Sequence, residues 1–386
     1  MSQVPASPER RFASDNNAGV HPRVLEAIAA ANSGHATAYG DDRWTRRAES
    51  VFRDLFGSSV ETFMVWGGTG ANVMALATML SPAGAVLCTD AAHINVDETG
   101  APERVLGAKL IDVPHDRGRL HPEQIREFAH FTGVMHHVQP SVLSITQSTE
   151  WGTLYTPDEV GALCDTAHSM GMTVHLDGAR IANATAALGG SVEALRAFTI
   201  DAGVDVVSFG GAKNGMMHGE AVVYLNTALA RSAPYVRKQV TQLPSKVRYI
   251  SAQFVALLED ELWIENASHA NRMATRLYGA GLCRPRSRTL RPAGGQQPVP
   301  GPARRSARGP SWLVVLLRLE RPRPSGPLDD LLGHDRRRYR RLRPGCRPLP
   351  GLIPSRRHPL PQPAGFDSSD LTHVTKSLID RPVSYP

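Results

Sequence analysis

The chain has 386 residues, of which 41% are hydrophobic and 20% charged, enough for one large or two medium domains with a buried core. It contains no run of about eighteen apolar residues, and the start MSQVPASPERRF lacks the apolar stretch of a secretion signal. We therefore expect neither a membrane span nor export. Four cysteines without close pairing indicate a reducing cytoplasm rather than a disulfide framework.

The net charge of +7 would ordinarily indicate a nucleic acid or an anionic membrane as partner, but one segment carries it. Residues 283–362 hold 19 Arg, no Lys, four acidic residues and 15 Pro, a local +15 that leaves −8 for the rest of the chain. So many prolines interrupt helices and remove the N–H donors of strands. We therefore place a boundary at Leu282–Cys283 and expect neither nucleic acid nor membrane as a partner.

Before that boundary, short apolar runs alternate with amphipathic stretches, a pattern typical of an α/β protein. The runs predicted as strands are Thr62–Trp66, Ala85–Cys88, Lys109–Val113, Val142–Thr146, Thr173–Asp177, Val204–Phe209 and Ala221–Leu225. Among the helices between them, one opens at Pro22 and ends at Gly34. Another begins with Thr156, Pro157 and Glu159 at the spacing of a capping box. This alternation predicts a mostly parallel sheet with helices on both faces, whose ligands bind at the carboxyl ends of strands.

The first strand end that could bind a ligand is the segment WGGTGAN (Trp66–Asn72), which opens a helix predicted over Ala71–Leu80. Glycines such as Gly68 permit a tight turn, and the helix N-terminus offers free N–H groups and a positive dipole to an anion. The hydroxyl of Thr69 adds a donor. The segment matches neither a Walker loop nor a dinucleotide fingerprint, and a purely structural helix entry is the alternative interpretation.

The second strand end carries Asp177, directly after an apolar run. A carboxylate there is costly unless a cation meets it, and a protonated pyridine nitrogen is such a cation. A helix cap or a metal ligand is the alternative. Because the sequence shows no second carboxylate or histidine at a useful spacing, we expect no metal.

The third and fourth strand ends carry Lys213 and His93. Lys213 lies among small residues directly after a buried strand, whereas an ordinary surface lysine lies on a polar helix face. Its amine is a candidate for a Schiff base. His93 follows the strand Ala85–Cys88, and its imidazole could stack on a pyridine ring, although a lone histidine is more often packed or solvent-exposed.

In this order, with the lysine 36 positions after the aspartate, the segments resemble the aspartate-aminotransferase-like fold of pyridoxal-phosphate (PLP) enzymes, PLP fold type I. Within that fold, about residues 11–275 closely resemble the low-specificity threonine aldolases. The motifs that carry the resemblance are FASD (12–15), AYGD (38–41), GGTGAN (67–72), AHINVDETGAPE (92–103), QPSVLSITQSTEWGTLY (139–155), HLDGARIANA (175–184) and SFGGAKNGMMHGEAVV (208–223).

The resemblance implies a role for each matched cofactor residue. Lys213 carries PLP as a Schiff base, Asp177 pairs with the pyridine nitrogen, and Gly68 with Thr69 holds the phosphate. His93 stacks on the ring and, directly or through a water molecule, serves as the base.

The resemblance also implies substrate contacts. Arg180 lies near the PLP 3′-oxygen and the substrate carboxylate, Ser14 lies near that carboxylate, and Tyr39 belongs to a segment that closes over the site. Glu150 stands where many relatives have a histidine, which leaves the threo/erythro preference open.

The activity so implied is cleavage of L-threonine or L-allo-threonine to glycine and an aldehyde, by a homodimer or homotetramer. A related PLP β-eliminating lyase or aminotransferase, or an inactive cofactor-binding remnant, is the alternative.

The predicted domains are an N-terminal segment (1–50) that belongs to the small domain and the active-site edge, a PLP-binding large domain (51–265), the start of a small domain (266–282) and an aberrant, disordered tail (283–386). The family's small domain should continue past residue 280 and supply a further arginine. Codons for 294–298 and 327–335, shifted by one base, can spell segments similar to that domain. We therefore expect a frameshifted tail and an incomplete small domain; a genuine basic tail that binds nucleic acid is the alternative.

Overall fold

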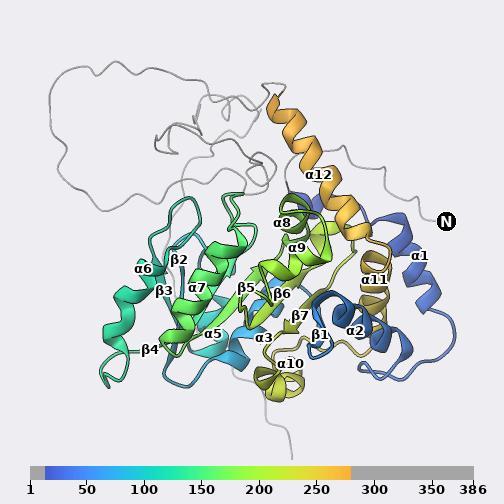
Figure 1. Cartoon of the computed structure of the whole chain (residues 1–386). Coiled ribbons are helices and arrows are strands. Elements are labelled where there is room, and N and C mark those ends of the chain that lie inside the picture. The colour runs from blue at the N-terminus through green and yellow to red at the C-terminus, as the bar shows by residue number, and fades with distance from the viewer. Residues whose placement is uncertain (1–13, 280–386) are drawn as a thin grey trace, which may run out of the picture. The chain divides into compact units, whose positions relative to one another are not determined.

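The computed structural model describes residues 14–279 (Figure 1). The expectations for a tail after residue 282 and for an incomplete small domain lie outside these residues. Within them, no helix combines the length and the apolar character that crossing a membrane requires.

The fold is built on a seven-stranded sheet with the strand order β1-β7-β6-β5-β4-β2-β3. Neighbouring strands from β6 to β3 pair in parallel, whereas β7 is antiparallel to both of its neighbours. The strands are β1 (Glu61–Val65), β2 (Gly84–Thr89), β3 (Lys109–Val113), β4 (Gln139–Thr146), β5 (Thr173–Gly178), β6 (Val206–Gly210) and β7 (Glu220–Tyr224). All seven predicted strands are therefore present, and the mostly parallel sheet is confirmed.

Helices cover both faces of the sheet. The α-helices are α1 (Pro22–Ala31), α2 (Arg43–Phe56), α3 (Gly68–Met79), α4 (His93–Val96), α5 (Ala101–Leu106), α6 (Pro122–Arg126), α7 (Pro157–Ser169), α8 (Ile181–Ala187), α9 (Val192–Ala197), α10 (Ala233–Gln239), α11 (Arg248–Leu258) and α12 (Leu262–Gly279). Short 3-10 segments are η1 (Asp15–Asn17), η2 (Glu127–Phe131), η3 (Ala212–Asn214) and η4 (Thr227–Ser232).

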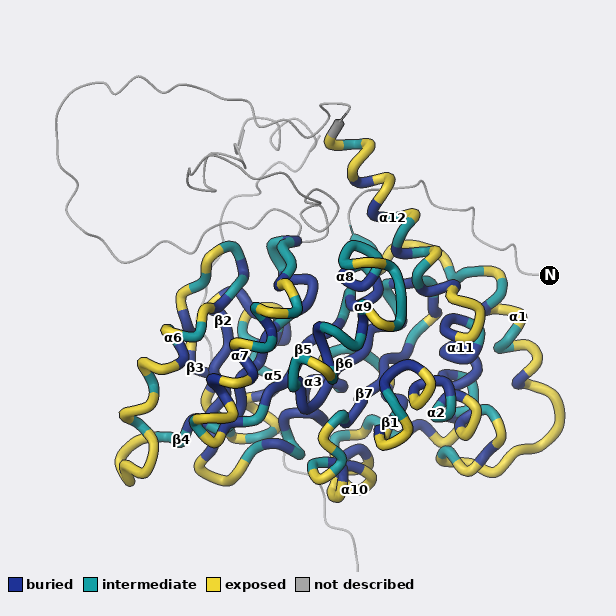
Figure 2. Tube along the Cα trace, viewed as in Figure 1, coloured by how far each residue is buried: buried dark blue, intermediate teal, exposed yellow. Residues whose placement is uncertain are grey.

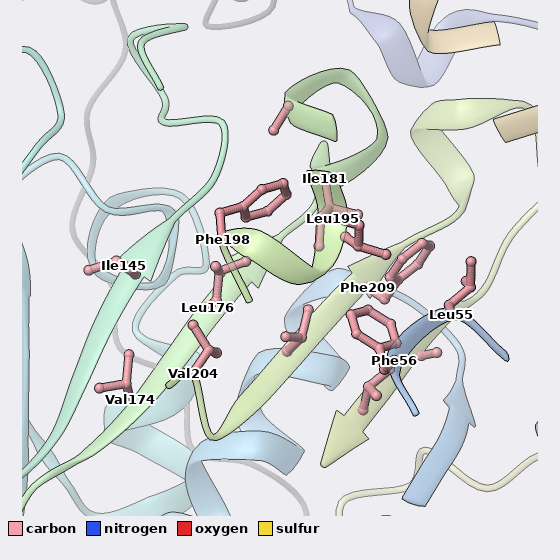
Figure 3. Close-up of a cluster of buried hydrophobic side chains, with 14 of the residues drawn as sticks. Leu55, Phe56, Ile145, Val174, Leu176, Ile181, Leu195, Phe198, Val204 and Phe209 are labelled. Carbon is pink, nitrogen blue, oxygen red and sulfur yellow. The ribbon is translucent and has the colours of Figure 1, made fainter. Parts of the chain in front are cut away.

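Two hydrophobic cores, one on each face, follow from the alternation of side chains along the strands. On β5, Val174 and Leu176 pack into the larger core (Figure 3), to which α2, α7, α9 and α11 also contribute residues. On β2, Val86 and Cys88 point the other way, into a smaller core formed mainly by α3. The polar residues His175 and Asp177 alternate with Val174 and Leu176, so they lie on the α3 face.

The local helix signals are largely confirmed. At the start of α7, Thr156 and Glu159 exchange side-chain-to-backbone hydrogen bonds, the predicted capping box. Helix α1 begins at Pro22 but ends at Ala31, three residues before Gly34, because Asn32 caps it through the carbonyls of the last turn. Helix α3 begins three residues earlier than predicted, directly after the loop that leaves β1.

Two of the predicted domain boundaries fall inside helices. The boundary after residue 50 lies within α2, and the boundary after residue 265 lies within α12. Two hydrogen bonds join α12 to α8: Nδ2 of Asn183 donates to Oδ1 of Asn271, and Nδ2 of Asn271 donates to the backbone carbonyl of Asn183. Figure 2 shows mostly exposed residues along the distal half of this helix. The division into domains stays a prediction.

Candidate active site

The carboxyl ends of the parallel strands meet at one edge of the sheet, where the predicted site residues gather. Asp177 is the second-last residue of β5, where it pairs with Thr146 at the end of β4 and with Ser208 on β6. Because β7 runs antiparallel, its first residue, Glu220, pairs with Gly210 at the end of β6 and with Val65 at the end of β1. The loop into α3 leaves from this same edge.

The N-terminus of α3 presents Gly68 and Thr69 as the first two helical residues after the N-cap Gly67. The first N–H groups of a helix lack intrahelical partners, and the helix dipole is positive there. A Cβ placed on Gly67 or Gly68 would meet nothing within 4 Å, so open space lies over this helix end. Gly70, by contrast, has the side chain of Gln242 against it, and a Cβ there would clash at 2.2 Å.

Asp177 is buried, with 4% of its surface exposed. Its Oδ2 accepts a hydrogen bond from Nδ2 of Asn72 at 2.9 Å, and its Oδ1 accepts from the backbone N–H of Ala179 at 3.0 Å. Both donors are neutral, and no ion pair to Asp177 occurs among the residues described. A buried carboxylate without a cation partner fits the role of pairing with a protonated ring nitrogen.

His93 begins α4 and has 38% of its side chain exposed. Its Nδ1 lies 2.9 Å from Oε1 of Glu98, whose side chain is fully buried. The pKa of His93 is raised above its ordinary value, first by this hydrogen bond and further by the negative charges of Asp177 and Glu98. Burial and the positive charge of Lys213 act in the opposite direction.

Lys213 lies in η3, in the turn-like connection of residues 211–219 between β6 and β7. The carboxylate of Glu220 accepts a hydrogen bond from the backbone N–H of Gly211 at 2.6 Å, which anchors the start of this turn. Gly210 touches the backbone of Ala179, where a Cβ would lie 2.3 Å from the carbonyl oxygen. The turn is therefore held directly beside the end of β5.

Glu220 itself is buried, and burial raises its pKa to about 7, against the lowering effects of the Gly211 hydrogen bond and the charge of Lys213. Asp177 and Lys213 act electrostatically on both His93 and Glu220. The structure thus brings Lys213, Asp177 and His93 together, as the sequence predicted.

The predicted substrate residues lie in three settings. Arg180 forms a two-point ion pair with Asp15, through Nε to Oδ2 at 2.5 Å and Nη2 to Oδ1 at 3.1 Å. Ser14 precedes that aspartate and caps η1 by accepting from the N–H of Asn16. This brings the N-terminal segment to the edge of the site.

Tyr39 is 55% exposed and has a positive φ of 63°. Its described contacts are the ammonium group of Lys238, 4.9 Å from the ring centroid, and the carbonyl of Ser245, which accepts from its backbone N–H. These contacts do not join it to the group around Asp177, and its role in closing the site stays a prediction.

Glu150 is held in place by two donors to the same oxygen, the backbone N–H of His93 at 2.8 Å and Oγ1 of Thr146 at 2.9 Å. Its other carboxylate oxygen is buried and has no hydrogen-bond partner. Burial raises the pKa of Glu150. The carboxylate therefore contacts the backbone of His93, and its contact with substrate remains a prediction.

Sequence reasoning missed Glu98, Asn72, Glu220 and Asp15. The expectation that no second carboxylate accompanies Asp177 is wrong, because one ligand atom each from His93, Glu98 and Asp177 lies within 4.8 Å of the other two. Glu98 and Asn72 belong to motifs that carry the resemblance, but nothing in the sequence indicated that their side chains would be in contact. Asp15 follows Ser14 in a third such motif.

A cavity of about 690 Å³ lies between α1 and α11, and its lining includes Tyr249, Trp66 (next to the N-cap of α3) and Met217 (in the connection that carries Lys213). None of the predicted site residues lines it.

Comparison with known proteins places this architecture. Residues 11–289 match the family model described as beta-eliminating lyase. The chain is 45% identical over 266 residues to the low specificity L-threonine aldolase of Pseudomonas aeruginosa, covering 69% of this chain and 76% of the relative. The structure of Leishmania major threonine aldolase matches with a TM-score of 0.66 and 32% identity, over 70% of this chain and 79% of that one. Aspartate aminotransferase from Thermus thermophilus matches with a TM-score of 0.54 and 19% identity, over 69% and 70% of the two chains, a likeness of fold alone.

Proposed function

The chain belongs to the beta-eliminating lyase family, and on that premise we propose that it is a PLP-dependent aldolase that cleaves L-threonine or L-allo-threonine to glycine and acetaldehyde. The observation that carries the proposal is the meeting of Lys213, Asp177 and His93 at one sheet edge, beside the open N-terminus of α3. These groups fit PLP in kind: an amine in the connection between β6 and β7, a buried carboxylate without an ion-pair partner among the residues described, and an anion site of free N–H groups.

In this proposal each residue has one task toward the cofactor. Lys213 binds it covalently through Nζ, and the N-terminus of α3 with Thr69 binds its phosphate. Asp177 holds a proton at the ring nitrogen, and His93 covers one face of the ring. Bound PLP supplies the electron sink that accepts the pair released when the Cα–Cβ bond breaks.

The remaining residues act on the substrate. Arg180, with Ser14, binds the α-carboxylate, although Arg180 must share its guanidinium with Asp15. His93 takes the proton of the β-hydroxyl, so that the carbon–oxygen double bond of the aldehyde forms as Cα–Cβ breaks. A homo-oligomer, with a cytoplasmic location, is the form we expect.

The test is product analysis with the purified chain. Wild type incubated with PLP and L-threonine should release glycine and acetaldehyde in equal amounts, whereas β-elimination would give 2-oxobutyrate and ammonia and transamination would give a 2-oxo acid. Lys213→Ala should abolish both cleavage and the borohydride-trapped cofactor adduct. Lys109→Ala, which removes an exposed lysine on β3, is the matched control and should change neither. An adduct trapped at another lysine contradicts the assignment.

A further inference from the structure

Glu98 is a buried carboxylate to which the proposed function gives no task. Its side chain is 0% exposed, and one oxygen, Oε1, meets both Nδ1 of His93 and Nδ2 of Asn72 at 2.9 Å. The other oxygen, Oε2, is buried without a hydrogen-bond partner. A carboxylate removed from water in this way is costly, so its retention needs a compensating cation or donor.

Asn72 holds Glu98 in place and links it to Asp177. The amide nitrogen of Asn72 donates to Oε1 of Glu98 and to Oδ2 of Asp177, both at 2.9 Å, which uses its two hydrogens. Since both neighbours are carboxylate oxygens, the amide must present its NH₂ group to them. Four side chains therefore form one hydrogen-bonded chain: His93, Glu98, Asn72 and Asp177.

The same atoms could be viewed as a metal site, because His93, Glu98 and Asp177 offer three ligand atoms close together. The hydrogen bonds argue against it. A metal ion would need these atoms at about 2.0–2.2 Å from itself, and an asparagine at its side would present oxygen. Here the NH₂ group of Asn72 points at both carboxylates, which is the arrangement of a hydrogen-bonded network.

The network decides which nitrogen of His93 is free. An ionised carboxylate only accepts hydrogen bonds, so Nδ1 of His93 must carry the hydrogen shared with Glu98. In the neutral imidazole, Nε2 then bears the lone pair. The other charged groups that act on His93 are Asp177 and Lys213, and Glu150 accepts from its backbone N–H.

Resting on the proposed function, we propose that Glu98, held by Asn72, is a positioning residue that fixes His93 in the tautomer with the proton on Nδ1, so that Nε2 is the atom that takes the β-hydroxyl proton. Glu98 also strengthens His93 as a base, because its negative charge stabilises the imidazolium form. It does so without touching substrate.

The first test measures the wild-type protein and needs a variant only to assign the signal. Nitrogen chemical shifts of the imidazole of His93, measured by NMR on the cofactor-free chain, should show Nδ1 protonated and Nε2 unprotonated above its pKa. His93→Gln identifies the signal. A neutral His93 with its proton on Nε2 overturns the proposal, whatever the fate of any variant.

The second test compares Glu98→Gln with Glu103→Gln, the same change at an exposed position five residues away. In Glu98→Gln the proton affinity of His93 should fall by about tenfold or more, because a charge and a charge-assisted hydrogen bond are lost. In the loaded enzyme, the rising limb of kcat/KM against pH should move to lower pH while its maximum decreases. Glu103→Gln should leave both as in wild type.

The two measurements separate failure of the inference from failure of the proposed function. If wild type releases no glycine from threonine yet the affinity of His93 for its proton falls in Glu98→Gln, the function is wrong and the positioning of His93 stands. If wild type cleaves threonine and Glu98→Gln changes neither the titration of His93 nor the pH profile, the positioning role is refuted. A fall in maximum rate with an unchanged pH profile likewise refutes it, because a merely structural defect would produce that result.

Discussion

Several carboxylates are buried around one lysine and one histidine, and this is the main energetic feature of the site at the scale of residues. Glu98, Asp177 and Glu220 are each less than a tenth exposed. Buried acids oppose the folded state unless cations or donors compensate for the lost water. Backbone N–H groups and Asn72 satisfy part of this demand. His93, which is hydrogen-bonded to Glu98, and Lys213, whose charge acts on Glu220, contribute further, although no ion pair to Asp177 occurs among the residues described. The negative charges of these carboxylates therefore favour the protonated form of His93 and a cationic group beside Asp177.

For Glu220, the cost of burying a carboxylate can be measured from the pH dependence of stability. Its pKa in the folded chain is about 7, above the ordinary glutamate value of 4.5, because burial disfavours its charged form. Its contribution to stability is therefore fully present below pH 4.5 and is lost as pH rises through 7. In the cofactor-free wild type, Glu220 should lower the free energy of unfolding by an amount on the order of 2–3 kcal/mol between pH 4.5 and pH 7. In Glu220→Gln we expect this decrease to be absent.

Urea unfolding at pH 4.5, 5.5, 6.5 and 7.5 measures this effect for wild type and variant. Glutamine keeps an oxygen that can accept from the N–H of Gly211, so the turn that carries Lys213 is retained. Glu123→Gln, at an exposed position on α6, serves as the control and should follow wild type. Parallel pH profiles for wild type and Glu220→Gln would contradict the expectation.

The residues that sequence alone could predict are those marked by a local pattern. Asp177 stands at the end of an apolar run, Lys213 and His93 follow such runs within four or five positions, and the topology of a parallel sheet then brings strand ends together. Asn72 and Asp177 are 105 positions apart, and Arg180 and Asp15 are 165 apart. Nothing in the local sequence signals such meetings, because they depend on where α3 and the N-terminal segment pack.

At the scale of elements, the sheet order explains why the site forms where it does. Periodicity predicted each strand but could not predict that β7 inserts antiparallel between β6 and β1. That insertion places the ends of β1 and β6 on either side of Glu220. It also places the N-terminus of α3 at the same edge as Lys213. The anion site and the lysine are thus neighbours as a consequence of strand order.

The proposed phosphate site at the N-terminus of α3 can be tested at Thr69. Thr69 is exposed in its first turn, where a hydroxyl adds a donor to the free N–H groups. Thr69→Val should weaken retention of PLP by about tenfold, the loss of one hydrogen bond to a charged group, without changing the products. Equilibrium dialysis against pyridoxal phosphate, followed by its absorbance, measures the effect. Thr69→Ser keeps the hydroxyl and should retain wild-type affinity; equal weakening by serine and valine would remove Thr69 from the phosphate site.

In the whole molecule, the residues described include all the groups proposed to bind the cofactor but only some of those expected to bind the substrate. Lys213, Asp177, His93 and the start of α3 all lie within residues 14–279. The anchors proposed for the substrate carboxylate within that range are Ser14 and Arg180, and Asp15 already occupies two donors of Arg180. The resemblance to threonine aldolases implies a further arginine beyond residue 280, where the sequence becomes rich in Arg and Pro. Cofactor binding is therefore expected to be robust and substrate binding weak.

This imbalance can be tested by changing the segment after residue 282. If the frameshift expected from the sequence is real, a chain whose coding sequence is read in the alternative frame from codon 283 should gain a further contact with the substrate carboxylate. Such a contact contributes about 1.5–3 kcal/mol, so we expect kcat/KM for threonine cleavage to rise roughly 10- to 150-fold over the present chain. Because Lys213 and Asp177 are common to both chains, their PLP content should be equal, and absorbance of the loaded proteins checks this before rates are compared. Equal cleavage by two equally loaded chains would show that residues 283–386 were never a defect and that Arg180 with Ser14 suffices to bind the substrate.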